Sequence, residues 1–408
     1  MGKSVTIVSN DREIDRRIIL VADTIEAAGW QVTIVAMPTG DESRPDDRRV
    51  VRLNLQRSNT VRARSATLYR GLRRVVPASA ANLMRYLALR FVADPERYFF
   101  NLYSGVLSTM KPDVFVAVDL PVLGVTRWAA EKAGALLVYD SHELFAEQEQ
   151  SAWEKARWRQ IEEKHIRSCD AVITVNQSIA RELERRYSLP AVNVVYNAVR
   201  LPHVLDQSKI FHRIYDLSPG DKIVLLQGGL SPGRNLEALV EAMRFVSVSN
   251  VHLVILGNGE MLERLKAITN RFGLLKRVHF HPAVPQDMLL SFTAAADIGV
   301  IPYQATCMNN LFCTPNKLFE YITAGVPILA NDLPEIRRIV AGHDIGQVAD
   351  LGGAKKIAAL IDECFKCESR LARWRSNLQS VREILSWQQE EKTVLKIFDA
   401  LQNEKASG

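Results

Sequence analysis

The chain has 408 residues, of which 47% are hydrophobic and 24% are charged, and its formal net charge is +6. This length predicts two or three domains, each with its own core. No window approaches 18 uncharged apolar residues, which argues against a membrane-spanning helix, and acidic residues follow the first apolar run, which argues against a signal peptide. Five cysteines, an odd number, are typical of a reducing compartment, so we expect a cytoplasmic protein.

Short apolar runs rich in Val and Ile alternate with segments of helical length along the whole chain. We expect strands at 5–9, 32–37, 114–119, 136–140, 171–176 and 193–197, and then at 222–229, 252–259, 278–281, 298–303, 327–332 and 345–350. Because these runs are continuous rather than alternating, the strands should be buried on both faces, as in parallel sheets. The twelve strands are too many for one compact sheet, so the pattern predicts two α/β domains.

Residues 51–110 carry ten Arg and only two acidic residues. In 57–76 the Arg residues are interleaved with Val, Leu and Tyr, and in 81–92 Leu83, Leu87 and Phe91 fall on one helical stripe. This combination suits an anionic membrane surface or an anionic acceptor; the alternative is an ordinary solvated helix face. No nucleic-acid-binding motif accompanies the basic residues, so we expect no nucleic-acid partner.

The predicted domain boundary lies between Asn197 and Lys222, where the turn cluster "DLSPGDK" precedes a strand. We therefore expect one domain at 1–205 and a second at 206–385. Residues 386–408 are predicted to form an amphipathic helix that either closes the second domain or crosses back to the first. Its apolar positions are Val394, Leu395, Ile397, Phe398 and Leu401.

Polar and glycine-rich segments follow three of the strands, at 140–143, 228–234 and 257–260. In open parallel sheets, ligands bind beyond the carboxyl ends of the strands. Gly228 and Gly229 leave backbone amides free to approach an anion, and Arg234, which precedes a helix, is well suited to a diphosphate. The loop matches neither the dinucleotide fingerprint nor the P-loop.

The segment "NNLFCTPNKLFEYITAGVPILAND" predicts a helix over 315–324, with Thr314 as N-cap, Pro315 in the first position and Gly325 just past the end. One polar arc of this helix holds Asn316, Lys317, Glu320 and Tyr321. A cation at a helix N-terminus favours phosphate, and a carboxylate one turn further along can accept sugar hydroxyls. The arc therefore suits a nucleotide, and its alternative is a surface Lys–Glu pair.

Cys364 and Cys367 form a CxxC with no second pair. Because structural zinc needs about four ligands, we interpret this motif as part of a helix and expect no metal site.

Taken together, these segments resemble the retaining, nucleotide-sugar-dependent glycosyltransferases of family 4, which have the GT-B fold. The resemblance covers nearly the whole chain, and "YDSHELF" (139–145) and "PNKLFEYITAGVPI" (315–328) are its most specific parts. It implies two Rossmann-like parallel-sheet domains facing a central cleft, with the acceptor on the first domain and the donor on the second. It also implies that the C-terminal helix returns to the first domain.

The resemblance implies a role for each candidate residue. Arg234 and Lys317 would hold the diphosphate, Gly228 and Gly229 would line the phosphate loop, Glu320 would bind the ribose, Asn316 would contact the donor, and His142 would face the donor sugar, with Asp140 and Glu143 beside it. On this basis His142, Arg234 and Lys317 are the expected catalytic residues.

Two positions depart from the family pattern. Phe312 stands where many members carry a glutamate near the transferred sugar, and Asn309 and Asn310 are candidates to replace it. The Gly-Gly turn after the first strand is also absent, and Asp15 or Arg16 is expected to face the cleft instead.

The resemblance thus implies transfer of a sugar from a UDP- or GDP-sugar to a lipid-linked or oligosaccharide acceptor, with retention, in cell-surface polysaccharide biosynthesis. We expect no cofactor and no metal requirement, and a cytoplasmic location with peripheral contact to the inner membrane face. The alternatives are a nucleotide-sugar epimerase or sugar phosphorylase on the same fold, and a non-catalytic nucleotide-sugar-binding protein.

Overall fold

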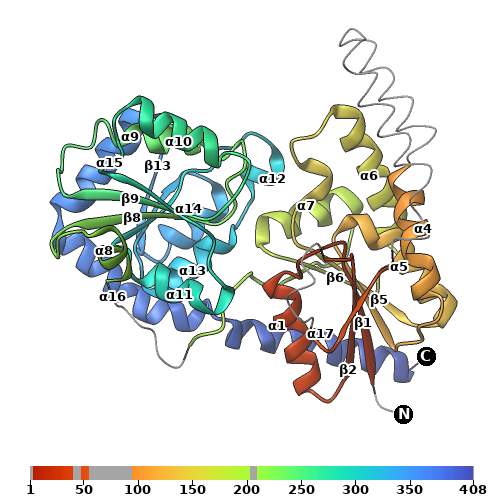
Figure 1. Ribbon diagram of the computed structural model, residues 1–408. Helices are drawn as coiled ribbons and strands as arrows, with labels where there is room; N and C mark the ends of the chain where they lie inside the picture. Colours follow the sequence, from red (N-terminus) through yellow and green to blue (C-terminus); the bar gives the residue numbers. More distant parts are fainter. Residues whose placement is uncertain (1–2, 40–46, 55–93, 203–208, 408) are drawn as a thin grey trace, which may run out of the picture.

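The structure is a computed structural model that describes residues 3–39, 47–54, 94–202 and 209–407 (Figure 1). The basic stretches predicted at 57–76 and 81–92 lie outside the described residues, as does the boundary predicted between residues 205 and 206. Within the described ranges, the chain forms two lobes, each built on a parallel sheet covered by helices on both faces.

The first sheet has the strand order β3-β2-β1-β4-β5-β6-β7. Every described pairing in it is parallel, as expected from strands buried on both faces. Its strands are β1 (Ser4–Val8), β2 (Gln31–Ala36), β3 (Val50–Arg52), β4 (Val114–Val118), β5 (Leu136–Ser141), β6 (Ala171–Thr174) and β7 (Asn193–Val194).

Neighbouring residues of these strands point to opposite faces of the sheet and enter different apolar layers. On one face, Phe115 and Tyr139 pack with four helices, whereas on the other face Val116 and Val138 pack with two. The four helices are α4 (Pro95–Leu107), α5 (Leu120–Ala133), α6 (Ala152–Ile166) and α7 (Gln177–Tyr187); the two are α1 (Arg16–Ala27) and α17 (Trp387–Ser407).

The second sheet has the order β10-β9-β8-β11-β12-β13, again parallel throughout its described pairings. Its strands are β8 (Lys222–Gln227), β9 (Val251–Leu256), β10 (Val278–His281), β11 (Ile298–Ile301), β12 (Ile328–Asn331) and β13 (Gly346–Ala349). One face is covered by α9 (Leu236–Ala242), α10 (Leu262–Arg271) and α15 (Ala354–Lys366), and the other by α8 (Ile210–Tyr215), α11 (Gln286–Ala294), α13 (Asn316–Ala324) and α14 (Pro334–Val340). Helix α16 (Glu368–Ile384) contributes to both layers.

The prediction of two parallel-sheet α/β units is confirmed, and each of the twelve predicted strands is present. The sequence interpretation missed β3, which lies at the edge of the first sheet. This strand has three residues, and Val51 in its middle is 38% exposed. Such a short apolar run does not stand out from a loop in the sequence.

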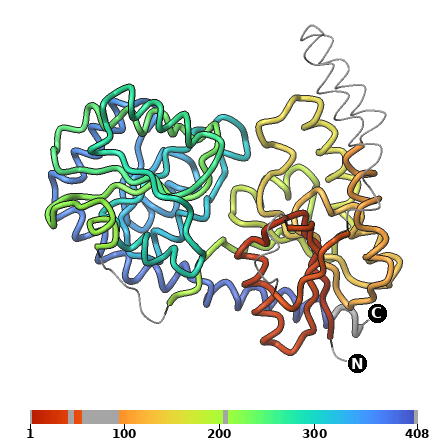
Figure 2. Tube along the Cα trace, viewed as in Figure 1, coloured from red at the N-terminus to blue at the C-terminus, as the bar shows by residue number. Residues whose placement is uncertain are grey.

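The C-terminal helix α17 packs on the first sheet although the chain has just left the second (Figure 2). Trp387 is fully buried there, and its indole Nε1 donates a hydrogen bond to Thr24 Oγ1 at 3.0 Å. Phe398 meets Trp30 edge to face, with ring centroids 5.7 Å apart. These aromatic contacts attach the C-terminal helix to the first lobe, which contains the start of the chain. Among the described helices, none is both long and apolar enough to cross a membrane.

Glu390 on α17 makes the stability of the protein depend on pH. Its carboxylate accepts a hydrogen bond from the Tyr196 backbone N–H at 2.9 Å, and burial raises its pKa to about 7. In the unfolded chain this group ionises near pH 4.5, so the protein should lose stability as the pH rises from about 4.5 to 7. We expect Glu390→Gln to raise the free energy of unfolding at pH 8 by on the order of 1–3 kcal/mol. At pH 4.5 the substitution should leave this free energy unchanged.

Thermal unfolding at the two pH values tests this expectation. Glu391→Gln is the matched control, because Glu391 is partly exposed and pairs with Arg200 at 3.6 Å. An equal gain from both substitutions, or a gain from Glu390→Gln that is the same at both pH values, would contradict the expectation.

Candidate active site

A pocket of about 770 Å³ opens at the carboxyl ends of strands from both sheets. The residues predicted for the site all line it: His142, Gly228, Gly229, Arg234, Asn316, Lys317 and Glu320. Glu143, Asn309 and Asn310 line it as well, whereas Asp140, Asp15 and Arg16 do not. The expectation that ligands bind beyond the carboxyl ends of the strands thus predicted the position of the pocket. Residues more than 170 positions apart in the sequence, such as His142 and Lys317, line the same pocket.

Helix α13 presents its N-terminus to this pocket, but its cap differs from the prediction. Pro315 is the N-cap residue, with an extended backbone (ψ 147°), and the helix begins at Asn316. Thr314 is buried instead, and its hydroxyl accepts a hydrogen bond from Asn176 Nδ2 at 3.1 Å. The expected capping residue is therefore used to join the two lobes, which leaves the first N–H groups of α13 without a side-chain cap. Gly325 ends the helix with φ +71°, as predicted.

The polar arc of α13 is narrower than the sequence indicated. Asn316, Lys317 and Glu320 face the pocket, but Tyr321 does not. Tyr321 is fully buried, and its hydroxyl donates to the Leu225 carbonyl at 2.9 Å beneath β8. The ring lies against Gly299, where an added Cβ would come within 2.6 Å of it. A tyrosine satisfies both an apolar contact and one buried hydrogen bond, so helical periodicity alone assigned it to the wrong face.

Arg234 and Lys317 bring two cationic groups to the middle of the pocket. Lys317 is only 5% exposed, and Arg234 Nη1 donates to the Gly229 carbonyl at 2.8 Å. Over the part of the chain that the structure describes, neither residue forms an ion pair. A buried cation without a counter-ion is costly, so this arrangement favours an anionic ligand between the two side chains and the N-terminus of α13.

Tyr303 makes cation–π contacts with both cations, and the sequence analysis did not predict it as a site residue. Its ring centroid lies 5.0 Å from the Arg234 guanidinium and 4.9 Å from Lys317 Nζ. Tyr303 is 6% exposed and follows β11, the neighbour of β8 in the sheet. The electron-rich ring attracts both cations without neutralising them, which keeps them available to an anion.

Replacing Tyr303 should therefore weaken anion binding. We expect Tyr303→Leu to raise the dissociation constant of a bound nucleoside diphosphate about five- to thirtyfold, since two cation–π contacts contribute roughly 0.5–1 kcal/mol each. Tyr303→Phe keeps the ring and should stay within about threefold of wild type. Isothermal titration checks both variants. A Phe variant as weak as the Leu variant would show that the hydroxyl, rather than the ring, matters.

Gly228 and Gly257 allow the phosphate loop to approach its neighbours closely. Gly228 has φ +101°, and a Cβ on it would lie 3.6 Å from Lys317 Cε. Gly257 has φ +147°, and a Cβ there would come within 2.1 Å of the Gly228 carbonyl oxygen. Side chains at these positions would strain the backbone and displace the loop, so the glycines fix its path.

Both oxygens of the Glu320 carboxylate have protein partners. Oε2 accepts from Gln227 Nε2 at 2.6 Å, and Gln227 is itself held by Thr293 Oγ1 at 2.9 Å. Oε1 pairs with Arg16 Nη1 at 3.0 Å. Arg16 comes from α1, so this ion pair connects the lobes. Asp15, the other residue expected to face the cleft, caps α1 by accepting from the Arg17 backbone N–H at 2.7 Å.

The surroundings of His142 favour its protonated form. Its Nε2 is 3.2 Å from Asp140 Oδ2, and Asp140 is paired in turn with buried Arg17 at 2.8 Å. Burial acts to lower the pKa of His142, but the charges of Asp140 and Asp119 outweigh it and raise this pKa to about 9. Burial likewise opposes the ionised form of Asp140, yet the positive charges of Arg17 and His142 keep the Asp140 pKa well below its ordinary range. These neighbours therefore favour His142 as a hydrogen-bond donor to the pocket rather than as a base.

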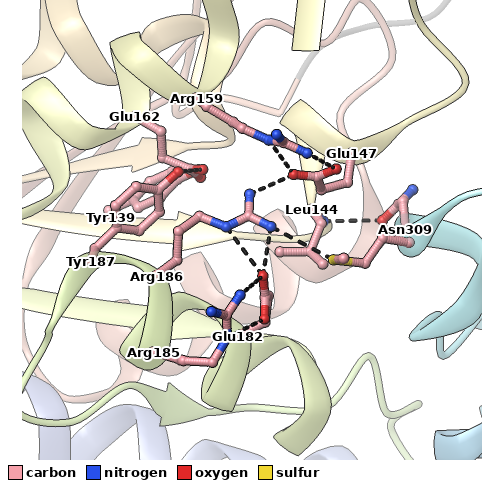
Figure 3. Close-up of polar contacts among 11 residues, drawn as sticks. Tyr139, Leu144, Glu147, Arg159, Glu162, Glu182, Arg185, Arg186, Tyr187 and Asn309 are labelled. Carbon is pink, nitrogen blue, oxygen red and sulfur yellow. Dashed lines mark hydrogen bonds and ion pairs between the residues drawn. The ribbon is translucent and has the colours of Figure 1, made fainter. Parts of the chain in front are cut away.

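The short helix α12 (Met308–Leu311) docks the second lobe onto the first. Asn309 Oδ1 accepts from the Leu144 backbone N–H at 3.0 Å (Figure 3). Phe312 packs against the apolar layer of the first lobe. The Phe312 carbonyl accepts from Asn176 Nδ2 at 2.8 Å. Asn310 bonds Thr306 Oγ1 at 2.8 Å. Phe312, where the family often has a glutamate, is thus an anchor between the lobes.

A buried charge network supports this docking surface (Figure 3). Arg186 on α7 binds Glu147 and Glu182, at 2.6 Å in each case, and its Nη2 also donates to Met308 Sδ at 3.6 Å. Glu147 receives a second arginine, Arg159, from α6. Each of these charges has a partner, so Glu147 and Glu182 can be largely buried while Arg186 connects α7 to α12.

The described residues contain no group of three or more His, Cys, Asp or Glu side chains placed to hold a metal ion. Cys364 of the CxxC is buried in the core on α15, and Cys367 lies between α15 and α16, both as free thiols. The interpretation of this motif as helical therefore holds for Cys364.

The two parallel-sheet lobes thus share a pocket at the carboxyl ends of their strands. Family profiles identify the class of protein: one described as "Glycosyl transferase 4-like domain" matches residues 14–199, and one described as "Glycosyl transferases group 1" matches residues 207–381. The chain belongs to the family-4-like glycosyltransferases with the GT-B fold.

Individual relatives are distant. A D-inositol 3-phosphate glycosyltransferase of Xylanimonas cellulosilytica is 22% identical over 259 residues, and the match covers 58% of this chain and 58% of that protein. Among solved structures, sucrose-phosphate synthase from Thermosynechococcus elongatus superimposes over the whole of both chains with a TM-score of 0.73 and 16% identity. HepE of Anabaena, solved with UDP and glucose, covers 98% of this chain and 100% of its own, with a TM-score of 0.72 and 15% identity. At these identities the structural likeness is one of fold.

Proposed function

We propose that this chain is a retaining hexosyltransferase that takes the sugar from a UDP- or GDP-sugar. One observation carries the proposal: Arg234 and Lys317 line one pocket, each within about 5 Å of the Tyr303 ring centroid, and form no ion pair among the described residues. A diphosphate complements their charge. HepE, a structural neighbour, has been solved with UDP-glucose, which gives the proposal a precedent in the same fold.

The remaining pocket residues would bind the other parts of this donor. Glu320, on α13, would accept the ribose hydroxyls, with Arg16 moving aside or sharing the carboxylate, and Asn316 would add a contact. Gly228 and Gly229 would offer backbone N–H groups to the phosphates. His142, as an imidazolium whose Nε2 is held by Asp140, would offer its Nδ1–H to a sugar hydroxyl.

The reaction breaks the bond between the sugar C1 and the diphosphate oxygen and forms a bond between C1 and an acceptor oxygen. Negative charge grows on the leaving diphosphate, where Arg234, Lys317 and the α13 N-terminus would stabilise it. The acceptor proton passes to the departing phosphate oxygen on the same face of the sugar, which gives retention. In this scheme cationic side chains stabilise the leaving group, so activity should survive EDTA.

The acceptor in this proposal is a lipid-linked or oligosaccharide molecule bound mainly by the first domain (1–205), and the donor is bound by the second (206–385). The pathway would be cell-surface polysaccharide biosynthesis at the cytoplasmic face of the membrane. The charge of residues 51–110 supports an anionic partner. Co-sedimentation with vesicles containing phosphatidylglycerol, with and without 0.5 M salt, tests the membrane part.

A thermal-shift panel of UDP, GDP, UDP-glucose, UDP-N-acetylglucosamine and GDP-mannose tests the donor assignment. Wild type should be stabilised by one nucleotide family, and Lys317→Ala and Glu320→Ala should each reduce the shift. No shift with any nucleotide would overturn the proposal. The anomeric configuration of the transferred sugar, followed by proton NMR, tests retention, and binding without turnover would identify a non-catalytic protein.

A further inference from the structure

We propose that Glu143 supplies, from the first lobe, the carboxylate that binds a hydroxyl of the transferred sugar. This inference rests on the proposed function and extends it to a specific residue. Phe312 stands where many family members carry a glutamate near the transferred sugar, and in this proposal Glu143 supplies the carboxylate that Phe312 lacks.

Phe312 cannot contribute a polar contact to the donor. Its side chain packs against the apolar layer of the first lobe, and its carbonyl is occupied by Asn176 Nδ2 at 2.8 Å. The carboxylates that line the pocket, among the described residues, are Glu13, Glu143 and Glu320. In the proposed donor complex Glu320 binds the ribose, and Glu13 is exposed near the start of the first lobe. Glu143 stands directly beside His142, the other polar group of this wall.

A chain of amides orients the Glu143 carboxylate. Asn309 Oδ1 accepts from the Leu144 backbone N–H at 3.0 Å, which forces Asn309 Nδ2 to face Glu143, whose Oε2 it contacts at 2.8 Å. Gln148 Oε1 accepts from Gln150 Nε2 at 3.2 Å, so Gln148 Nε2 is turned toward Glu143 Oε1 and donates to it. Each carboxylate oxygen thus receives one neutral amide donor.

This arrangement leaves Glu143 with capacity to bind a ligand. A carboxylate offers about four acceptor positions, and the two amides use two of them. Within the described ranges Glu143 forms no ion pair, and its half-buried side chain lines the pocket. A fixed carboxylate with free lone pairs is a strong acceptor for sugar hydroxyls.

The order of residues along the chain places Glu143 at the sugar end. Asn309, its contact, lies before the N-terminus of α13, Lys317 lies in the first turn, and Glu320 lies one turn further on. With the diphosphate at Lys317 and the ribose at Glu320, the sugar extends the other way, toward Asn309 and Glu143. Its hydroxyls then meet the His142 imidazolium and the Glu143 carboxylate together.

The test compares Glu143→Gln with wild type by isothermal titration of UDP, UDP-glucose, GDP and GDP-mannose. In Glu143→Gln one oxygen becomes an NH₂ group that must face the NH₂ of Asn309 or of Gln148. We expect the dissociation constant of the nucleotide sugar to rise about ten- to hundredfold, as for loss of a hydrogen bond to a charged group. The dissociation constant of the parent nucleoside diphosphate should stay within about twofold.

Glu149→Gln is the matched control. Glu149 is exposed, six residues further along the same loop, and also bridges the lobes by accepting from Thr306 Oγ1, but it does not line the pocket. Its substitution should leave the affinity for both ligands unchanged. If Glu143→Gln does not fold, Asn309→Ala provides a second route, since it removes one orienting donor and should weaken nucleotide-sugar binding selectively. A wild-type titration with 3-deoxy, 4-deoxy and 6-deoxy donor analogues needs no variant.

The outcomes separate the two proposals. Equal losses for diphosphate and nucleotide sugar, or no loss for either, would overturn the role of Glu143 and leave the donor assignment in place. A wild-type protein that binds none of the four ligands would overturn both. A selective loss of the nucleotide sugar, absent in Glu149→Gln, would establish Glu143 as a sugar-binding residue.

Discussion

Lys317→Ala is expected to lower kcat for nucleoside diphosphate release from the nucleotide sugar about 10²–10³-fold, and Arg234→Ala should do the same. The cause is that negative charge on the diphosphate grows as the C1–O bond breaks, so each cation binds the transition state more strongly than the bound donor. The Michaelis constant should rise much less than kcat falls. Both side chains contact Tyr303 and share one anion, so the double variant should cost less than the product of the single effects.

Steady-state release of UDP or GDP, with the donor that the binding panel selects, measures this effect. Lys266→Ala is the control, because Lys266 lies on α10 and pairs with exposed Glu263 at 2.9 Å. Activity within about threefold of wild type in both Lys317→Ala and Arg234→Ala would mean that the diphosphate is held elsewhere.

Arg17→Met is expected to destabilise the first lobe by about 3–5 kcal/mol. Arg17 is 3% exposed and holds Asp140 through two hydrogen bonds, at 2.8 and 3.3 Å, and it also donates to the Val195 carbonyl. Without it, the buried carboxylate keeps His142 as its one side-chain partner among the described residues. The apolar length of the methionine preserves much of the packing, so the loss reports the uncompensated charge.

Urea unfolding followed by circular dichroism measures this loss, with the first lobe expected to unfold before the second. Combining Arg17→Met with Asp140→Asn should recover a large part of it, because both charges are then removed together. Arg127→Met removes an exposed pair with Glu131 and should cost less than about 1 kcal/mol. Equal losses from Arg17→Met and Arg127→Met would show that the buried pair has no special weight.

Local patterns were enough to predict the two sheets and the position of the pocket. Continuous runs such as 114–118 and 251–256 bury both faces of a strand, and this burial needs helices on both sides. The strand-end rule then placed His142, Gly228 and Gly229 at one cleft, because the carboxyl ends of parallel strands lie at one edge of each sheet.

The same reasoning failed where one residue had two possible uses. Thr314 has the chemistry of an N-cap, yet its hydroxyl is taken by Asn176 of the other lobe. Tyr321 fits the polar arc of α13, yet its ring and hydroxyl are both satisfied in the core. In each case a tertiary contact provided a better partner than the local one, and no neighbouring residue in the sequence signals that contact.

The fold class, the glycine-rich loop and the two cationic residues could be predicted from the amino-acid sequence alone, since each depends on residues within one strand, turn or helix. The partners of the site residues became visible only in the folded structure: Arg16 reaches Glu320 across 304 positions, Asn309 reaches Glu143 across 166, and the Tyr303 ring contacts both Arg234 and Lys317. Side-chain contacts between distant segments arise from the packing of the two lobes. Periodicity and spacing describe only neighbours along the chain, so they carry no information about such pairs.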